Sequence, residues 1–145
     1  SINAWQVSLG DIDLSAFTKL TDVTMSPTAG YTSIQLPDGI KSFKSIIKYA
    51  NHEPVGPTTL DLTQYTDLEY VSVMDSYGEP AALKSLNVSG LSKLALLESG
   101  FYWSGYDSQT IIVESEAKRD QLKTSWKEVM GYGEENPANA WTIQQ

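Results

Sequence analysis

The hydrophobic residues of the chain follow one short pattern four times. Each copy opens with a triplet in which an Asp, Asn or Gln stands between two apolar residues. Further apolar residues follow at intervals of three, with one interval of four after Leu36. These later positions are Phe17, Leu20 and Val23 in the first copy, Ile40, Phe43 and Ile46 in the second, Tyr65, Leu68 and Val71 in the third, and Leu91, Leu94 and Leu97 in the fourth. The openings at 12–14, 34–36, 60–62 and 86–88 start 22, 26 and 26 residues apart, and a partial fifth copy at 111–113 starts 25 residues later.

Apolar residues at intervals of three over so short a span fit neither a sustained amphipathic helix nor the alternation of a strand. The pattern therefore predicts a chain that turns continuously about an axis. Two segments of each copy, the opening triplet and a later run such as 68–73, do alternate and should form short strands that stack in parallel on the matching segments of neighbouring copies. Because copies of about this length are typical of leucine-rich repeats, we predict a leucine-rich-repeat solenoid of four to five coils.

Segments rich in Pro and Gly separate the copies, at 26–30, 51–57, 75–80 and 104–108. They are expected to be loops at one edge of the solenoid. A β-sandwich would also show short apolar runs between turns and is the alternative fold. A sandwich would not require the apolar residues of all four copies to follow the same internal spacing.

The pattern changes to that of one helix after residue 113. Ser115 is a suitable N-cap, Glu116 follows in the first turn, and glycines from Gly131 onward would end the helix. The apolar face of this helix comprises Ala117, Leu122, Trp126, Val129 and Met130, and Trp141 and Ile143 are expected to fold back beside it. Because a solenoid needs its open end covered, we predict one domain over 1–145, with an N-terminal edge (1–11), repeats (12–113) and a C-terminal cap (114–145).

Two segments resemble the repeats of BspA-like leucine-rich-repeat proteins. They are 20–27, with the sequence Leu-Thr-Asp-Val-Thr-Met-Ser-Pro, and 34–40, with the sequence Ile-Gln-Leu-Pro-Asp-Gly-Ile; the ending from Thr110 to Trp126 also resembles that family's strand and capping helix. The resemblance covers roughly residues 9–130. It implies a bacterial cell-surface or secreted protein that adheres to host proteins, other cells or glycans. The third and fourth copies look closer to other bacterial leucine-rich repeats, and the Cys common in the family is absent.

The composition narrows the range of partners. With 10 Lys and Arg against 18 Asp and Glu, the formal charge of −8 would repel phosphate backbones and anionic head groups, so we expect neither nucleic acid nor a membrane surface as partner. The absence of cysteine removes disulfides and thiolate catalysis. No segment approaches the roughly 20 apolar residues of a membrane span. The start at Ser1, with no initiator Met or signal peptide, indicates a processed or excised part of a larger chain or assembly.

Candidate catalytic groups are few. His52 is the only histidine and lies in a loop segment, so a histidine metal cluster is impossible and we expect a solvated side chain. Carboxylates that would be available for glycoside hydrolysis are Asp11, Asp13, Asp61, Glu69, Asp75 and Glu98. Asp13 and Asp61 occupy the same place in two copies, which indicates a solvent-facing position rather than an active site. We therefore predict no enzyme activity, no catalytic residue, no cofactor and no metal.

The predicted binding residues form two groups. Alternation in the later strand of each copy should turn Asp22, Thr24, Tyr70 and Ser72 outward, together with Ser45, Ile47, Leu96 and Glu98. The second group, Tyr102, Trp103 and Tyr106, lies in the aromatic segment 100–107 and would form a platform for sugar rings or apolar side chains. The alternative for this segment is that Phe101 and Trp103 are buried under the helix as part of the cap.

These observations favour a non-catalytic binding module for adhesion to, or recognition of, a protein or glycan outside the cell. The alternative is a structural spacer, or an assembly part of a larger surface protein or of a phage or appendage particle. A glycoside hydrolase is the third possibility.

Overall fold

The chain winds into a solenoid with two faces of strands. The computed structural model describes residues 2–4, 10–28, 31–47, 56–75, 83–101, 110–130 and 140–144. One face is a five-stranded sheet of order β1-β3-β5-β7-β9, made of β1 (Ile2–Ala4), β3 (Asp22–Thr28), β5 (Ser42–Ile47), β7 (Tyr70–Asp75) and β9 (Leu96–Phe101). The second face holds a sheet of order β11-β10-β8-β6, made of β6 (Thr59–Asp61), β8 (Ser85–Asn87), β10 (Thr110–Val113) and β11 (Ala140–Ile143), and a separate pair of β2 (Asp11–Asp13) and β4 (Ser33–Gln35).

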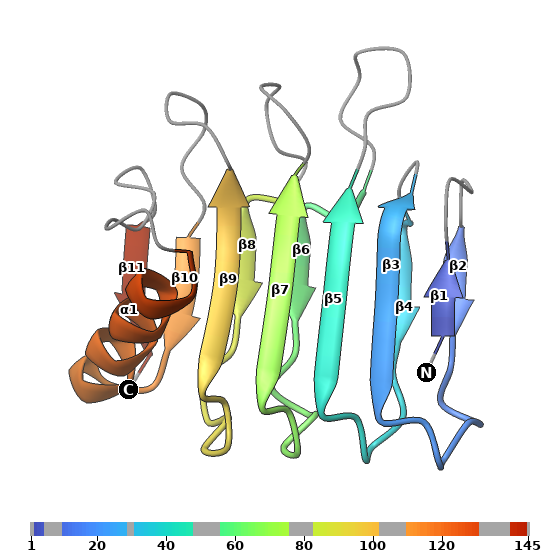
Figure 1. The fold of residues 1–145 in the computed structure, drawn as a ribbon, viewed down its shortest axis with the longest axis horizontal. Helices are drawn as coiled ribbons and strands as arrows, with labels where there is room; N and C mark the ends of the chain where they lie inside the picture. Colours follow the sequence, from blue (N-terminus) through green and yellow to red (C-terminus); the bar gives the residue numbers. More distant parts are fainter. Residues whose placement is uncertain are drawn as a thin grey trace.

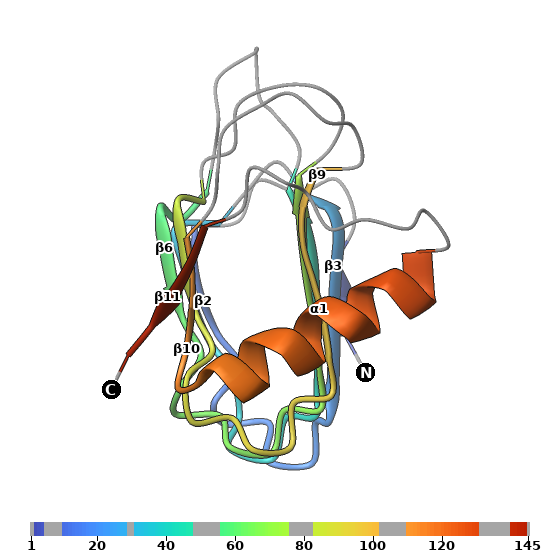
Figure 2. The same cartoon turned by 90° about the vertical axis from the view of Figure 1, so that its left-hand side faces the viewer.

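The two faces lie against each other as layers. Figure 1 shows the five-stranded sheet in front of the second face, with the strands of the two faces running in opposite directions. In Figure 2 the helix α1 (Glu116–Met130) starts beside β10 on the second face, crosses the end of the solenoid and extends past the five-stranded sheet. All strand pairs in the described part of the chain are parallel. The predicted solenoid with parallel strands and a C-terminal helix is confirmed, and the β-sandwich alternative is wrong because a sandwich is built from antiparallel sheets.

The three-residue spacing of the apolar pattern arises from consecutive tight turns between the faces. In the first coil the N–H of Phe17 donates to the Leu14 carbonyl at 3.0 Å, and the N–H of Leu20 donates to the Phe17 carbonyl at 2.8 Å. The same two turns recur at 62, 65 and 68, and at 88, 91 and 94. The continuous turning expected from the sequence is thus made by backbone hydrogen bonds three residues apart.

The second coil is shorter at the corner where the chain passes from the second face to the five-stranded sheet. The strand register pairs Phe43 with Val23, so Phe43 and not Ile46 is the equivalent of Val23. The sequence alignment of the second copy was wrong because this coil has a single three-residue turn, in which the N–H of Ile40 donates to the Pro37 carbonyl at 3.1 Å. The first, third and fourth coils have two such turns.

A tyrosine of the third coil bridges the shortened corner. Directly after β6, the N–H of Leu62 donates to the carbonyl of Asn87 in β8 of the next coil at 2.9 Å. The equivalent N–H of Leu36 donates instead to the hydroxyl of Tyr65 at 2.9 Å. The described strands of the second face divide into two sheets between β4 and β6. The phenol of Tyr65 therefore replaces a backbone acceptor where strand pairing is interrupted.

Polar side chains at the ends of three strands of the second face stabilise the first turn of the corner that follows each strand. Asp13, Asp61 and Asn87 accept hydrogen bonds through Oδ1 from the N–H groups of Ser15, Thr63 and Ser89, at 2.9, 2.9 and 3.1 Å. Each bond joins a side chain to the backbone two residues later, which is an Asx turn. The bonds from Ser15 also hold the pKa of Asp13 below its ordinary value. Asp13 and Asp61 are exposed as predicted, and in addition they shape the chain.

The core fills the space between the faces. One row across the five-stranded sheet, formed by Val23, Phe43, Val71 and Leu97, is at most 2% exposed. Burial of each side chain of this size contributes roughly 1.5–3 kcal/mol. The rows of apolar residues therefore hold successive coils together along the whole solenoid.

The helix closes the C-terminal end of this core. Ser115 is the N-cap, because its hydroxyl accepts a hydrogen bond from the Lys118 N–H at 3.1 Å. Leu122 is 1% exposed in the core. Ala117 was expected on the same face but is exposed, whereas Lys118 is 6% exposed and its Nζ donates to the Leu94 carbonyl at 2.6 Å. The side chains of the predicted apolar positions 126, 129 and 130 lie outside the described residues.

The last strand lies beside the helix as expected. β11 pairs in parallel with β10, and the half-buried Trp141 and Ile143 pack against the core. The Nζ of Lys123 lies 5.6 Å from the centroid of the Trp141 ring, which is a cation–π distance. Helix and strand together complete the C-terminal cap.

Candidate binding surface

The outward side of the five-stranded sheet, here called the outer face, carries two rows of mostly polar residues. Since Val23, Phe43, Val71 and Leu97 point into the core, their neighbours in each strand point outward. One row follows the register Asp22, Ser42, Tyr70, Leu96, and the other follows Thr24, Lys44, Ser72, Glu98. Three of the four sequence-predicted strand positions are at least partly accessible, namely Asp22, Thr24 and Tyr70.

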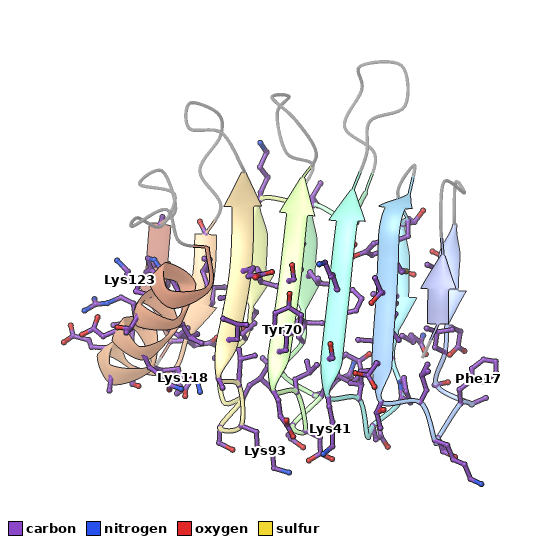
Figure 3. The ribbon with its side chains drawn as sticks, viewed as in Figure 1. Phe17, Lys41, Tyr70, Lys93, Lys118 and Lys123 are labelled. Atoms are coloured by element: carbon purple, nitrogen blue, oxygen red, sulfur yellow. The ribbon has the colours of Figure 1, made fainter. Side chains whose placement is uncertain are left out.

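A hydrogen bond between the rows fixes the centre of the outer face. The hydroxyl of Tyr70 donates to Oε2 of Glu98 at 2.7 Å, across from β7 to β9. Burial of the phenol, followed by the adjacent Glu98 carboxylate, raises the pKa of Tyr70 to about 12, against a smaller lowering by Ser72. Tyr70 therefore stays protonated and donates at physiological pH. Figure 3 shows its side chain on the outer face, near the middle of the sheet.

Two serines expected to be exposed are instead buried. Ser72 points outward by alternation but is 0% exposed, because it is the smallest side chain of a row in which Lys44 and Glu98 flank it on the neighbouring strands. Ser45 was placed on the outer face by the wrong alignment of the second copy. It alternates with buried Phe43, lies on the inner side and is 0% exposed.

The outer face also contains a cation that the sequence analysis did not select. Lys44 lies between Thr24 of β3 and Ser72 of β7 in one row. Alignment of Phe43 with Val23 identifies Lys44 as outward, so the sequence contained this signal, but the second copy had been aligned three residues out of register. At the other end of the face, Asp22 is exposed and accepts a hydrogen bond from the Thr21 hydroxyl at 2.6 Å.

Ion pairs line the edge of the sheet near the tight turns. Lys41 Nζ lies 3.3 Å from Glu69 Oε1, and Lys93 pairs with Asp67. The pairing with Lys93 lowers the pKa of Asp67, and the same bond raises the pKa of Lys93. Both pairs are exposed to solvent, which screens their attraction, so they contribute little to the stability of the fold. Their positions below the strands are marked by Lys41 and Lys93 in Figure 3.

The aromatic group predicted from 100–107 lies outside the described residues. This holds for Tyr102, Trp103 and Tyr106, and also for His52. The outer face therefore brings together the predicted positions on β3 and β7, with β5 between them, while the aromatic platform stays a prediction.

Several carboxylates considered for glycoside hydrolysis have partners within the fold. Asp13 and Asp61 shape corners, Glu98 accepts from Tyr70, and Asp11 accepts a hydrogen bond from the Ser33 hydroxyl at 2.9 Å. Within the described ranges, no group of three or more His, Cys, Asp or Glu residues is arranged to hold a metal ion. The helix found in those ranges is neither long nor apolar enough to cross a membrane.

The function of the chain is therefore inferred from its fold and from the outer face, because comparisons with known proteins supply no relative. No protein-family model, curated protein or solved structure matches the chain.

Proposed function

We propose that the protein is a non-catalytic binding module whose outer face engages a protein or glycan partner. The observation that carries this proposal is the ordered polar surface around the Tyr70 to Glu98 hydrogen bond, on a sheet whose other side is anchored in the core. A surface fixed in this way loses little conformational entropy on binding. It offers a carboxylate at Asp22, an ammonium at Lys44 and the hydroxyl of Thr24 within one face.

The bacterial cell-surface setting and the leucine-rich-repeat family are part of this proposal. They rest on the resemblance of segments 20–27 and 34–40 to BspA-like repeats and on the solenoid architecture. Adhesion modules present broad, repetitive surfaces of this type to extended partners.

The test is binding of the purified chain to an array of extracellular proteins and glycans. The variant Thr24→Ala alters the outer face, and Thr59→Ala is its matched control because Thr59 is an exposed strand threonine on the second face. The proposal expects a ligand whose binding is weakened by Thr24→Ala and unchanged by Thr59→Ala. Binding weakened equally by both variants, or no ligand on a broad array, would contradict it.

The second candidate function is that of an assembly part. It is favoured by the exposure of Phe17 at the N-terminal end of the solenoid, where its side chain is 55% exposed. Aromatic side chains are enriched at the contacts between protein surfaces.

A further inference from the structure

Lys44 is a half-buried cation in the middle of the outer face. It lies on β5 between Thr24 of β3 and Ser72 of β7. Two exposed lysines at the edge of the sheet, Lys41 and Lys93, are held in ion pairs, whereas no described residue forms an ion pair or a hydrogen bond with the Lys44 ammonium. A charge that has lost part of its hydration gains from a partner of opposite sign. Lys44 is therefore placed to bind an anionic group from outside the fold.

The side chain opposite Lys44 on β7 has no hydrogen-bond partner among the described residues. Since Val71 and Val73 are buried in the core, Ser72 points toward the outer face. Its hydroxyl is 0% exposed and makes no hydrogen bond, although it lies near enough to Tyr70 to lower the pKa of the phenol. A buried hydroxyl without a partner costs free energy that an incoming acceptor recovers. The Lys44 side chain flanks this hydroxyl and has a flexible four-carbon stem, so its movement toward an anion gives the anion access to Ser72.

Three donors of one row thus point to the same side of the sheet. The half-buried Thr24 supplies a hydroxyl on one side of Lys44, and Ser72 supplies a hydroxyl on the other. Neighbouring strands are about 4.8 Å apart, so a group bound to the ammonium also lies within reach of either hydroxyl. One positive charge with hydroxyl donors beside it matches a single carboxylate, whose two oxygens accept charge-assisted hydrogen bonds.

We propose that the outer face binds a glycan that carries an acidic sugar, with the sugar carboxylate on the Lys44 ammonium and the hydroxyls of Thr24 and Ser72 as further donors. This inference rests on the proposed function of the outer face as a binding surface and names the class of its ligand. The charge of Lys44 supplies most of the attraction, and the two hydroxyls fix the position of the carboxylate.

The carboxylates of the outer face distinguish an acidic glycan from an acidic protein or a polyanion. Asp22 lies at one end of the face and Glu98 at the other, and the whole chain carries a formal charge of −8. A partner with several adjacent negative charges would be repelled by these groups. A sugar acid presents one carboxylate among neutral hydroxyls, and Asp22 and Glu98 can accept hydrogen bonds from those hydroxyls.

Tyr70 supplies an apolar surface beside this polar row. Its hydroxyl reaches Glu98, which lies on the next strand and two residues further along the register. The phenol therefore runs along the sheet instead of standing away from it. Since the side chain is half-buried, the accessible part of the ring can stack against the apolar face of a sugar ring.

The extent of the outer face limits the length of glycan that it can hold. From Thr24 to Glu98 the row crosses three strand intervals, which is about 14 Å. Beside β9 the helix α1 extends past the five-stranded sheet and bounds the face on that side (Figure 2). The surface therefore fits an oligosaccharide that lies across the strands.

The first test is calorimetric binding of oligosaccharides that contain glucuronic, galacturonic or sialic acid, each compared with its carboxyl-reduced form. Carboxyl reduction removes the charge and keeps the rest of the sugar. At least one acidic oligosaccharide should bind, and its reduced form should bind at least about tenfold more weakly, as expected when a charged hydrogen bond is lost. Equal affinities of the acidic and reduced forms would overturn the inference.

Failure of this inference can be told apart from failure of the proposed function. If a neutral glycan or a protein binds and is weakened by Thr24→Ala while no acidic oligosaccharide binds, the inference is wrong and the proposed function stands. A glutamate-rich peptide that binds more tightly than every acidic oligosaccharide would lead to the same conclusion. If nothing binds, both are contradicted.

The second test changes the cation. Lys44→Met removes the charge and keeps most of the aliphatic stem, so it should weaken binding of the acidic oligosaccharide about tenfold and leave binding of the reduced form unchanged. Lys44→Arg keeps the charge and should retain most of the affinity. Lys19→Met is the matched control, because Lys19 is exposed at a corner of the first coil, and circular dichroism checks that each variant is folded. Full affinity of Lys44→Met, or an equal loss in Lys19→Met, would contradict the placement of the carboxylate on Lys44.

Discussion

The hydroxyl of Tyr65 accepts a hydrogen bond from the backbone N–H of Leu36, 29 residues earlier, at 2.9 Å in a buried position. The two residues belong to adjacent coils whose short strands on the second face are not paired. The Tyr65 side chain therefore supplies a hydrogen bond between the two coils on the face where the backbone ladder is interrupted.

We predict that Tyr65→Phe destabilises the fold. It removes only the hydroxyl, so the buried N–H of Leu36 is left without its partner, at a cost of about 1–3 kcal/mol. Urea unfolding followed by circular dichroism measures this loss. A midpoint equal to that of the unsubstituted protein would show that the bond contributes nothing.

The buried amine of Lys118 predicts a pH dependence of stability. Burial lowers the pKa of Lys118 below its ordinary value of 10.5, so the charged form is disfavoured in the folded state. Between the lowered folded pKa and 10.5 the unfolded chain binds more protons, and stability should rise with pH through this window. In Lys118→Met, which keeps the aliphatic stem, that rise should be absent.

The comparison uses thermal unfolding of the two proteins at a series of alkaline pH values. Lys118→Met also leaves the Leu94 carbonyl without its donor, so a uniform loss of stability is expected at lower pH. Identical pH profiles for the two proteins would refute the account of the amine.

Tyr70 predicts the opposite trend at higher pH. Its pKa in the folded state is raised to about 12 by burial and by Glu98, above its ordinary value of 10.0. The stability that it contributes is fully present below pH 10.0 and is lost as pH rises toward about 12. Tyr70→Phe should remove this alkaline loss. Ultraviolet titration of tyrosinate gives an independent check, since the phenol that ionises near pH 12 in the unsubstituted protein should be absent from that variant.

The Asx turns predict different results for two substitutions of one residue. Asp61→Asn keeps an acceptor for the Thr63 N–H and should preserve stability, whereas Asp61→Ala removes it and should lower the unfolding midpoint. Asn87 already serves this position in the fourth coil. If both variants unfolded alike, the role of the side chain in the turn would be wrong.

The sequence predicted the solenoid architecture because the apolar residues follow nearly the same spacing in each coil. It failed in the second coil because Ile46 continues the three-residue spacing although Phe43 is the buried equivalent of Val23. A missing turn is invisible when an apolar residue happens to follow at the same interval. The same error of register moved Ser45 outward and hid Lys44.

Other differences depend on three-dimensional neighbours. Ser72 is covered because longer side chains stand on both sides of it, which the order of residues along one strand does not show. Lys118 counts as polar in a helical pattern, yet its long stem allows burial while the amine reaches Leu94. Phe17 fits the spacing of the pattern as its equivalents do, yet its side chain is 55% exposed, which the spacing alone does not predict.

The most direct measurement of the central claim is the dissociation constant of the array ligand with Lys44→Glu and Lys84→Glu. Lys44 lies within the outer face, whereas Lys84 precedes β8 of the second face and carries the same charge change away from it. A role of the outer face in binding predicts at least about a tenfold weaker affinity for Lys44→Glu, equivalent to roughly 1.4 kcal/mol, and an unchanged affinity for Lys84→Glu. Equal affinities of the two variants would contradict binding through the outer face.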